Sequence, residues 1–281
     1  MDYFTRAIVA AVLVGLVCGL VGTLVVLRRR AFFTVALTHA TFPGGVVAAI
    51  VGIDIVLGAG LFGVLLVGLM TLLSRERRQG PHVAAGIVLT LGYALGMLVV
   101  SLHPNLPIRV DTFLTGSILT VSDANLVTLA VVLAVVLVAL LGFGTRILFS
   151  TFDRRGAEAA GFGEGVTDAL VLGIIALSVA ACMPAIGSIL AIATIAAPAA
   201  AARLWTGSVG GMLALSCVLG VVVAIAGLLA SRAFGLAAGG SIAITASLVF
   251  VVAFLRPRRG VRRSTVTADE TRAPRPAAVR P

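Results

Sequence analysis

The side chain with the clearest chemical potential in this sequence is a histidine inside an apolar segment. His39 lies in the stretch 28–44, where three arginines precede a mostly apolar run that ends with Pro43 and Gly44. At a rise of about 1.5 Å per residue, the imidazole lies roughly 13 Å beyond Arg30, close to the midplane of a ~30 Å hydrocarbon core. Because an ionisable group at that depth is costly, we interpret His39 as a candidate ligand on a transport path. The alternative is a neutral histidine that bonds a carbonyl between helices.

The helix that carries this histidine is predicted to break at Pro43 and Gly44. Pro43 has no amide hydrogen to donate to the carbonyl of His39, and its ring crowds the same carbonyl. Broken helices are tolerated at mid-membrane where they are buried or line a polar cavity. The pattern therefore indicates a transport site built around a discontinuous helix.

Three further side chains are weaker candidates for a metal ligand. Thr38 precedes the histidine, and Cys182 and Met183 offer soft donors near the end of a later apolar run. The three cysteines of the chain, Cys18, Cys182 and Cys217, lie in apolar runs without a second cysteine at metal-motif spacing. This arrangement favours buried free thiols over a metal centre.

Composition places these residues in a membrane protein. Of the 281 residues, 60% are hydrophobic and 11% are charged, and the mean hydropathy is +1.16. Apolar runs long enough to span a bilayer recur along the chain, which excludes a water-soluble domain. The runs are continuous rather than alternating, which excludes a transmembrane β-barrel. We expect an all-α polytopic bundle of about eight or nine transmembrane helices.

Nine apolar segments are candidate spans, and polar stretches connect them. The segment 110–124 is too polar and too short to span, so we expect a half-helix against the bundle. We assign 1–255 to a transmembrane domain and 256–281, rich in Arg, Pro, Ser and Thr, to a disordered basic cytoplasmic tail. The spans cover about residues 6–27, 31–52, 55–74, 82–102, 125–149, 166–185, 187–204, 210–231 and 240–255.

Arginines account for the net charge of +10, and they indicate membrane orientation rather than nucleic-acid binding. If residues 28–30 face the cytoplasm and sides alternate, only Arg6, Arg109 and Arg232 fall outside. This distribution fits the positive-inside rule for a multi-pass protein of the cytoplasmic membrane, with the N-terminus outside and the C-terminus in the cytoplasm. The sequence has no Walker-type motif, so we do not expect this chain to hydrolyse ATP.

Several segments, taken in order, carry a resemblance to a known family. Over about residues 5–255 the sequence resembles the membrane permeases of ABC importers for zinc, manganese and related metal ions. The family's histidine segment is matched by residues 34–44, TVALTHATFPG, which contain His39, Pro43 and Gly44. The other matching segments are GLVCGLVGTLVVLRRR, AAGIVLTLGYALGMLVVSL, FLTGSILTVSDANL, FDRRGAEAAGF and IGSILAIATIAAPAAAARLW.

The resemblance implies a fold, partners and a mechanism. Members have a helical bundle like that of type II ABC importers, form homodimers and work by alternating access. They bind a pair of cytoplasmic ABC ATPase subunits and receive metal from an extracytoplasmic metal-binding protein. The chain itself is expected to bind no cofactor, because the metal ion is cargo. The short cytoplasmic helix that enters the ATPase in related importers corresponds to about 203–211, so we assign coupling to Arg203, Leu204, Trp205, Thr206 and Gly207.

One position departs from the family pattern. Val35 stands four residues before His39, where the family usually has an aspartate that would face the same side of the helix and share the metal. An imidazole without a carboxylate favours zinc over manganese as the cargo. Cys182, Met183 and His103 are further candidate ligands.

Three other functions are open on the sequence. An intramembrane hydrolase would use Ser117 with His39, but the serine lacks a recognisable nucleophile motif. An ion-coupled secondary transporter would also use a broken helix, but no repeated half with matching interruptions is evident. An ABC permease for a metal chelate or another substrate usually has a longer chain with more spans. A zinc or manganese permease is the favoured interpretation.

Overall fold

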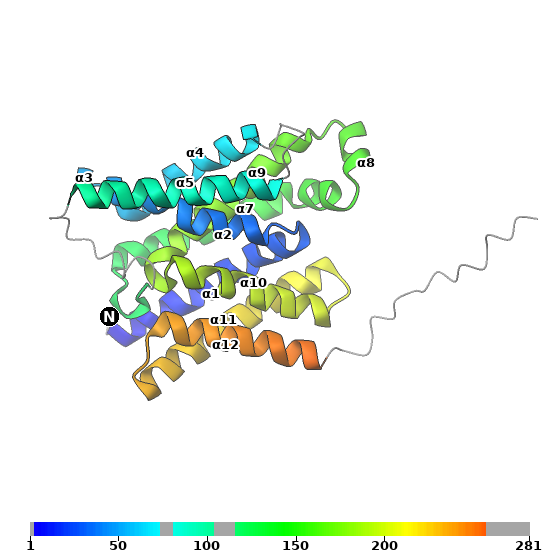
Figure 1. Ribbon diagram of the computed structural model, residues 1–281. Coiled ribbons are helices and arrows are strands. Elements are labelled where there is room, and N and C mark those ends of the chain that lie inside the picture. The colour runs from blue at the N-terminus through cyan, green and yellow to red at the C-terminus, as the bar shows by residue number, and fades with distance from the viewer. Residues whose placement is uncertain (1–2, 74–80, 104–115, 257–281) are drawn as a thin grey trace, which may run out of the picture.

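The computed structural model describes residues 3–73, 81–103 and 116–256, and within these ranges every regular element is a helix (Figure 1). Of the predicted tail only Arg256 is described, so the division into domain and tail stays a prediction. In chain order the elements are α1 (Tyr3–Leu27), α2 (Ala31–Ala40), α3 (Phe42–Val51), α4 (Ile55–Leu73), α5 (Pro81–Leu102), the 3-10 turn η1 (Ile118–Thr120), α7 (Asp123–Phe152), α8 (Arg154–Ala159), α9 (Glu164–Ile186), α10 (Ser188–Trp205), α11 (Val209–Phe234) and α12 (Ala238–Leu255).

Length and composition make most of these helices membrane spans. In the part of the chain that the structure describes, 8 spans are long and apolar enough to cross a membrane when α2 and α3 are counted together. α10 is a shorter apolar helix among them. The predicted spans all coincide with helices, and the all-α polytopic fold is confirmed.

α1 is the central helix of the bundle and packs against α7, α9, α10 and α11. Its close approach to α11 depends on glycines. A β-carbon at Gly15 would lie 2.7 Å from the backbone of Gly220, and one at Gly19 would lie 2.6 Å from the Cα of Cys217. Gly22 meets α10 in the same way, because a β-carbon there would lie 2.0 Å from a backbone carbonyl oxygen. Small residues thus bring the membrane helices together, as the glycine content predicts.

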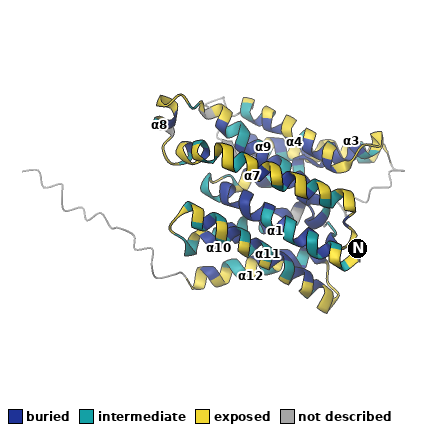
Figure 2. Cartoon of the chain, turned by 180° about the vertical axis from the view of Figure 1, so that it is seen from behind, coloured by how far each residue is buried: buried dark blue, intermediate teal, exposed yellow. Residues whose placement is uncertain are grey.

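The two broad faces of the bundle differ. In Figure 1, α2 lies in front between α5 and α10, and it contacts both helices. Figure 2 shows the opposite face, where α7 is largely exposed. The N-terminus lies at one end of the bundle and α8 at the other (Figure 1), and we name these the N-terminal end and the α8 end.

The predicted break in the second span is present. α2 ends at Ala40 and α3 begins at Phe42, with Thr41 between them. Pro43 lies in the first turn of α3, where its missing amide hydrogen costs least. The amide of Gly44 donates to the carbonyl of Thr41 at 3.1 Å, which starts the new helix. Because Thr41 keeps a right-handed helical conformation, with φ −78° and ψ −11°, the break changes the hydrogen bonding without opening a loop.

The polar segment expected to form a half-helix is more irregular in its described part. Residues 116–122 contain only the single turn η1, and 110–115 lie outside the described residues. The amide of Ser117 donates to the carbonyl of Pro184 at 3.1 Å, and Ile118 is fully buried. The segment therefore satisfies one of the free carbonyls at the C-terminal end of α9.

The polar connection 152–165 contains one short helix, α8, at the end of the bundle (Figure 1). Asp153 caps this helix, since its carboxylate accepts from the amide of Gly156 at 2.9 Å. Phe162 then packs edge to face on Phe149 of α7, with ring centroids 6.4 Å apart and planes at 85°. These contacts fix the connection against the end of α7.

Candidate functional site

α2 exposes one narrow row of side chains on the surface of the chain. Phe32 is 42% exposed, Val35 and His39 are partly exposed, and the residues between them are buried. Positions three and four apart share one face of an α-helix, so these three side chains form a single row. We name it the open row of α2. The row stops at the break, because Ala40 and Thr41 are buried, so His39 faces outward where the helix is interrupted.

Tyr93 of α5 is the aromatic neighbour of His39. The two ring centroids are 6.3 Å apart and the ring planes meet at 88°, which is an edge-to-face arrangement. Tyr93 also lies 6.0 Å from the ring of Phe42, the first residue of α3. It is 37% exposed, so both rings border the open side of α2. The sequence interpretation did not include Tyr93, although it is one of 2 tyrosines in the chain and lies inside an apolar run.

The helix break packs against two glycines of α5. A β-carbon at Gly92 would lie 2.7 Å from the Cα of Ala40, the last residue of α2. One at Gly96 would lie 2.3 Å from the ring of Phe42. These glycines are four residues apart and therefore on one face of α5. They let both sides of the break contact the helix that carries Tyr93.

Two of the weaker candidate ligands point into the core rather than along the open row. Thr38 is 1% exposed, and its hydroxyl donates to the carbonyl of Val35 at 2.8 Å. Met183 is also buried, and its sulfur accepts from the hydroxyl of Thr41 at 3.5 Å, beside the helix break. The structure therefore does not bring these side chains together with His39 on one surface.

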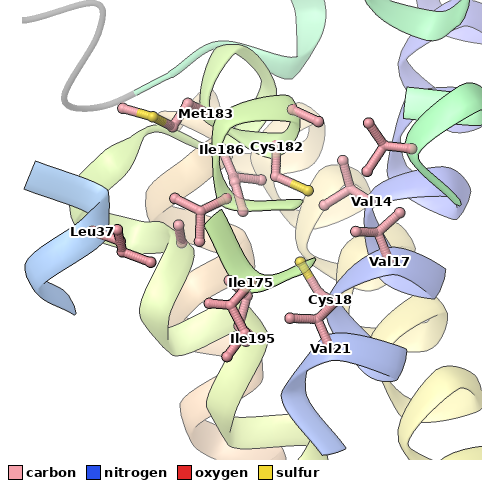
Figure 3. Close-up of a cluster of buried hydrophobic side chains, with 14 of the residues drawn as sticks. Val14, Val17, Cys18, Val21, Leu37, Ile175, Cys182, Met183, Ile186 and Ile195 are labelled. Carbon is pink, nitrogen blue, oxygen red and sulfur yellow. The ribbon is translucent and has the colours of Figure 1, made fainter. Parts of the chain in front are cut away.

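Cys182 is buried opposite Cys18 of α1. Figure 3 shows the two sulfur atoms among apolar side chains. Both residues are fully buried, and the three cysteines are free, as the sequence predicts. Among the described residues, no group of three or more His, Cys, Asp and Glu side chains is placed to hold a metal ion. Cys182 therefore contributes to the core in this arrangement, apart from His39.

A second polar cluster lies at the α8 end, where α1 meets α7 and α9. Arg28 donates from Nη1 to the carboxylate of Asp168 at 2.7 Å and from Nε to the hydroxyl of Thr151 at 3.0 Å. Arg30 pairs with the other carboxylate oxygen of Asp168, and Arg28 also donates to the hydroxyl of Ser150. We name this set the Asp168 cluster; its members are Arg28, Arg30, Ser150, Thr151 and Asp168.

The chain matches the ABC 3 transport family over residues 1–257. It belongs to this family. Its similarity to the manganese transport system membrane protein MntC of Halalkalibacterium halodurans is 34% identity over 216 residues, 76% of this chain and 74% of that protein. Its similarity to the zinc transport system membrane protein TroC of Treponema pallidum is 31% identity over 225 residues, 76% of each protein. The predicted membership of the zinc and manganese permeases is confirmed.

Solved structures agree with this assignment. The ABC 3 family chain is similar to PsaBC from Streptococcus pneumoniae in complex with Fab, with a TM-score of 0.82 and 30% identity over 90% of this chain and 91% of that chain. It also shares the fold of an inward-facing, putative metal-chelate type ABC transporter, with a TM-score of 0.70 over 90% of this chain and 85% of that chain. At 19% identity the second likeness concerns the fold alone.

In this ABC 3 family chain, the residues assigned to ATPase coupling do not form a separate helix. Arg203, Leu204 and Trp205 are the last turn of α10, and Thr206 and Gly207 belong to the short link before α11. The guanidinium of Arg203 donates to a carbonyl near the end of α1 at 3.4 Å, and the indole of Trp205 donates to the carbonyl that follows α12 at 3.1 Å. The expected helix over 203–211 is absent because α10 continues to Trp205. The coupling role of these residues stays a prediction.

Proposed function

We propose that this chain is the membrane subunit of an ATP-driven importer that moves a divalent metal ion across the cytoplasmic membrane by alternating access. The observation that carries the proposal is the position of His39, which faces outward from α2 at the helix break. Relatives named for manganese and zinc transport support a cargo of this class. The metal ion is cargo, and a separate ABC ATPase hydrolyses the ATP.

Zinc is the favoured cargo, and manganese is the second candidate. The open row of α2 consists of Phe32, Val35 and His39, and it offers one imidazole and no carboxylate. Nitrogen ligands suit Zn²⁺, whereas Mn²⁺ prefers carboxylate and other oxygen ligands. The hydrophobic Val35 one turn from the histidine is therefore the residue that favours zinc.

A second copy of this chain is the partner that the open row requires. An ionisable side chain facing lipid is costly, so His39 needs a surface that covers it. A homodimer formed through the face that carries α2 and α5 would place the two histidines along a shared path. Tyr93 lies on the same face and would be covered with them.

The ATPase is assigned to the α8 end and the extracytoplasmic metal-binding protein to the N-terminal end. This orientation places Arg28, Arg30 and Arg203 on the cytoplasmic side, as the positive-inside rule requires. It also exposes α8 to the cytoplasm beyond the spans (Figure 1). The N-terminus is then outside and the C-terminus inside.

Reconstitution into liposomes tests this function. Liposomes that contain the permease, its ATPase and its binding protein should accumulate zinc when ATP is supplied to the ATPase side, and liposomes with the permease alone should not. Uptake by the permease alone, driven by a proton or sodium gradient, would establish a secondary transporter instead. Competition with free Mn²⁺ and with a stable zinc chelate separates the metal-ion importer from a chelate importer, since only free metal should compete.

A further inference from the structure

The Asp168 cluster joins the turn between α1 and α2 to the helices on either side of α8. Arg28 directly follows α1, Arg30 directly precedes α2, and both guanidinium groups share the carboxylate of Asp168 in the first turns of α9. Arg28 also holds Thr151 in the last turn of α7. The carboxylate therefore connects α9 to the turn between α1 and α2, and Arg28 extends the connection to α7.

The charges in this cluster are largely shielded from solvent. The side chain of Arg28 is 8% exposed, and those of Arg30 and Asp168 are 21% and 22% exposed. If one partner of an ion pair with this little solvent contact is removed, the other charge is left buried without compensation. Breaking the pair is therefore costly. The cluster therefore makes its segments move together rather than slide past one another.

A second set of contacts fixes the connection around α8 to the same turn of α9. The guanidinium of Arg146 lies over the ring of Phe162, with its central carbon 5.3 Å from the ring centroid. Arg146 also donates from Nε to the hydroxyl of Thr167 at 3.0 Å, and Thr167 is the residue before Asp168. A displacement of the α8 connection is thus transmitted directly to the carboxylate.

On the other side of the cluster, Arg30 is attached firmly to α2. Its carbonyl accepts from the amide of Thr34 at 3.0 Å and from the hydroxyl of the same residue at 3.1 Å. His39 follows nine residues later on the same uninterrupted helix. A shift of Arg30 therefore moves the histidine as part of one rigid segment.

We propose that Asp168 is a positioning residue that links the α8 connection to α2, and so links the ATPase to the metal path. The inference rests on the proposed function, in which the α8 end faces the ATPase. When the ATPase displaces α8, the first turn of α9 moves and Asp168 draws Arg30 and α2 with it. Without the carboxylate, the ATPase can still hydrolyse ATP, but hydrolysis no longer moves the metal site.

The variant Asp168→Asn tests this role in the reconstituted complex of permease, ATPase and binding protein. The number of zinc ions transported per ATP hydrolysed should fall by about fivefold or more, which is the size of a typical coupling between sites. Asp168→Glu should recover most of that ratio. The control is Asp123→Asn, which removes the 3.0 Å pair with Arg6 at the N-terminal end and should leave the ratio unchanged.

Two further measurements keep the test decisive. Co-purification with the ATPase shows whether Asp168→Asn still assembles; if it does not, Arg30→Gln is used, because that variant keeps the pair between Arg28 and Asp168. The proposal is overturned if the assembled variant transports as many zinc ions per ATP hydrolysed as the wild type. That includes the case in which hydrolysis and transport fall in proportion. If the wild-type complex itself moves no metal, the proposed function fails before this inference is tested.

Discussion

The imidazole of His39 and the phenol ring of Tyr93 meet edge to face, with centroids 6.3 Å apart and planes at 88°. The two residues belong to α2 and α5, and the glycine beside Tyr93, Gly92, contacts the last residue of α2. The position of the imidazole therefore depends on α5 as much as on its own helix. α5 is the support of the candidate metal ligand.

Replacing the histidine tests whether it is a ligand on the path. His39→Ala should lower zinc uptake by about tenfold or more, which is at the lower end of the effect of disturbing a metal site. Assembly with the ATPase should be unchanged, since the open row contributes little to the core. The matched control is Phe32→Ala, which shortens another exposed side chain of the same row and removes no metal ligand. Equal uptake kinetics in the two variants would remove His39 from the path.

A carboxylate at the position of Val35 should change the choice of metal. Val35 and His39 lie on the same open row, so Val35→Asp places an oxygen ligand one turn from the imidazole. We expect competition by Mn²⁺ against zinc uptake to strengthen by roughly tenfold, or about 1.4 kcal/mol. Val35→Asn keeps the shape without the charge and should give a smaller change. If both variants retain the wild-type preference, Val35 does not determine the metal.

The helix break and the shared face of Val35 and His39 could be predicted from local sequence alone. Pro43 lacks an amide hydrogen wherever it is placed in a helix, and a spacing of four puts Val35 and His39 on one face. These features depend on a few adjacent residues and on backbone geometry. The structure therefore agrees with the sequence interpretation at this level.

The neighbours of the histidine did not follow from the sequence, because they depend on how separate helices pack. Tyr93 reaches His39 through the register between α2 and α5, which is fixed by Gly92 and Gly96. Met183 lies on a helix that is apolar on all sides, so its pattern does not reveal which face is buried. Helix α10 likewise extends through residues that the resemblance assigned to a separate helix.

The close contact between Gly92 and α2 should be sensitive to the addition of a single methyl group at position 92. Gly92→Ala puts a β-carbon 2.7 Å from Ala40, and we expect a loss of about 1–3 kcal/mol in the free energy of unfolding. The control is Gly86→Ala on the same helix, where a β-carbon meets no atom within 4 Å. Alanine there should be neutral or stabilising by up to about 1 kcal/mol, because it favours the helix.

Thermal unfolding of the purified protein in detergent, with identical lipid content, measures this difference. Gly92→Ala should unfold at a lower temperature than the wild type, and Gly86→Ala at the same or a higher temperature. Zinc uptake should fall with Gly92→Ala, since α2 must move away from α5 to relieve the clash. Equal unfolding temperatures for the two alanine variants would contradict the close approach of α2 and α5.

The turn before α2 contains an arginine in a conformation that favours glycine. Arg29 has φ +56°, and the amides of Arg29 and Arg30 donate to the carbonyls of Val26 and Val25 at 3.3 and 2.9 Å. These two bonds are the usual C-terminal closure of a helix, in which glycine occupies the left-handed position. A β-carbon at this left-handed position costs roughly 1–2 kcal/mol. The turn keeps this conformation with Arg28 and Arg30 both paired to Asp168.

Arg29→Gly should therefore stabilise the protein by about 1 kcal/mol, which corresponds to an increase of about 2 °C in unfolding temperature. Arg29→Ala is the control, because it removes the same guanidinium and keeps the β-carbon, so it should give no such increase. Both variants leave Asp168 and its two arginine partners in place, so the number of metal ions moved per ATP should not change. If the alanine variant gains as much stability as the glycine variant, the effect comes from the lost charge and the backbone of Arg29 carries no strain.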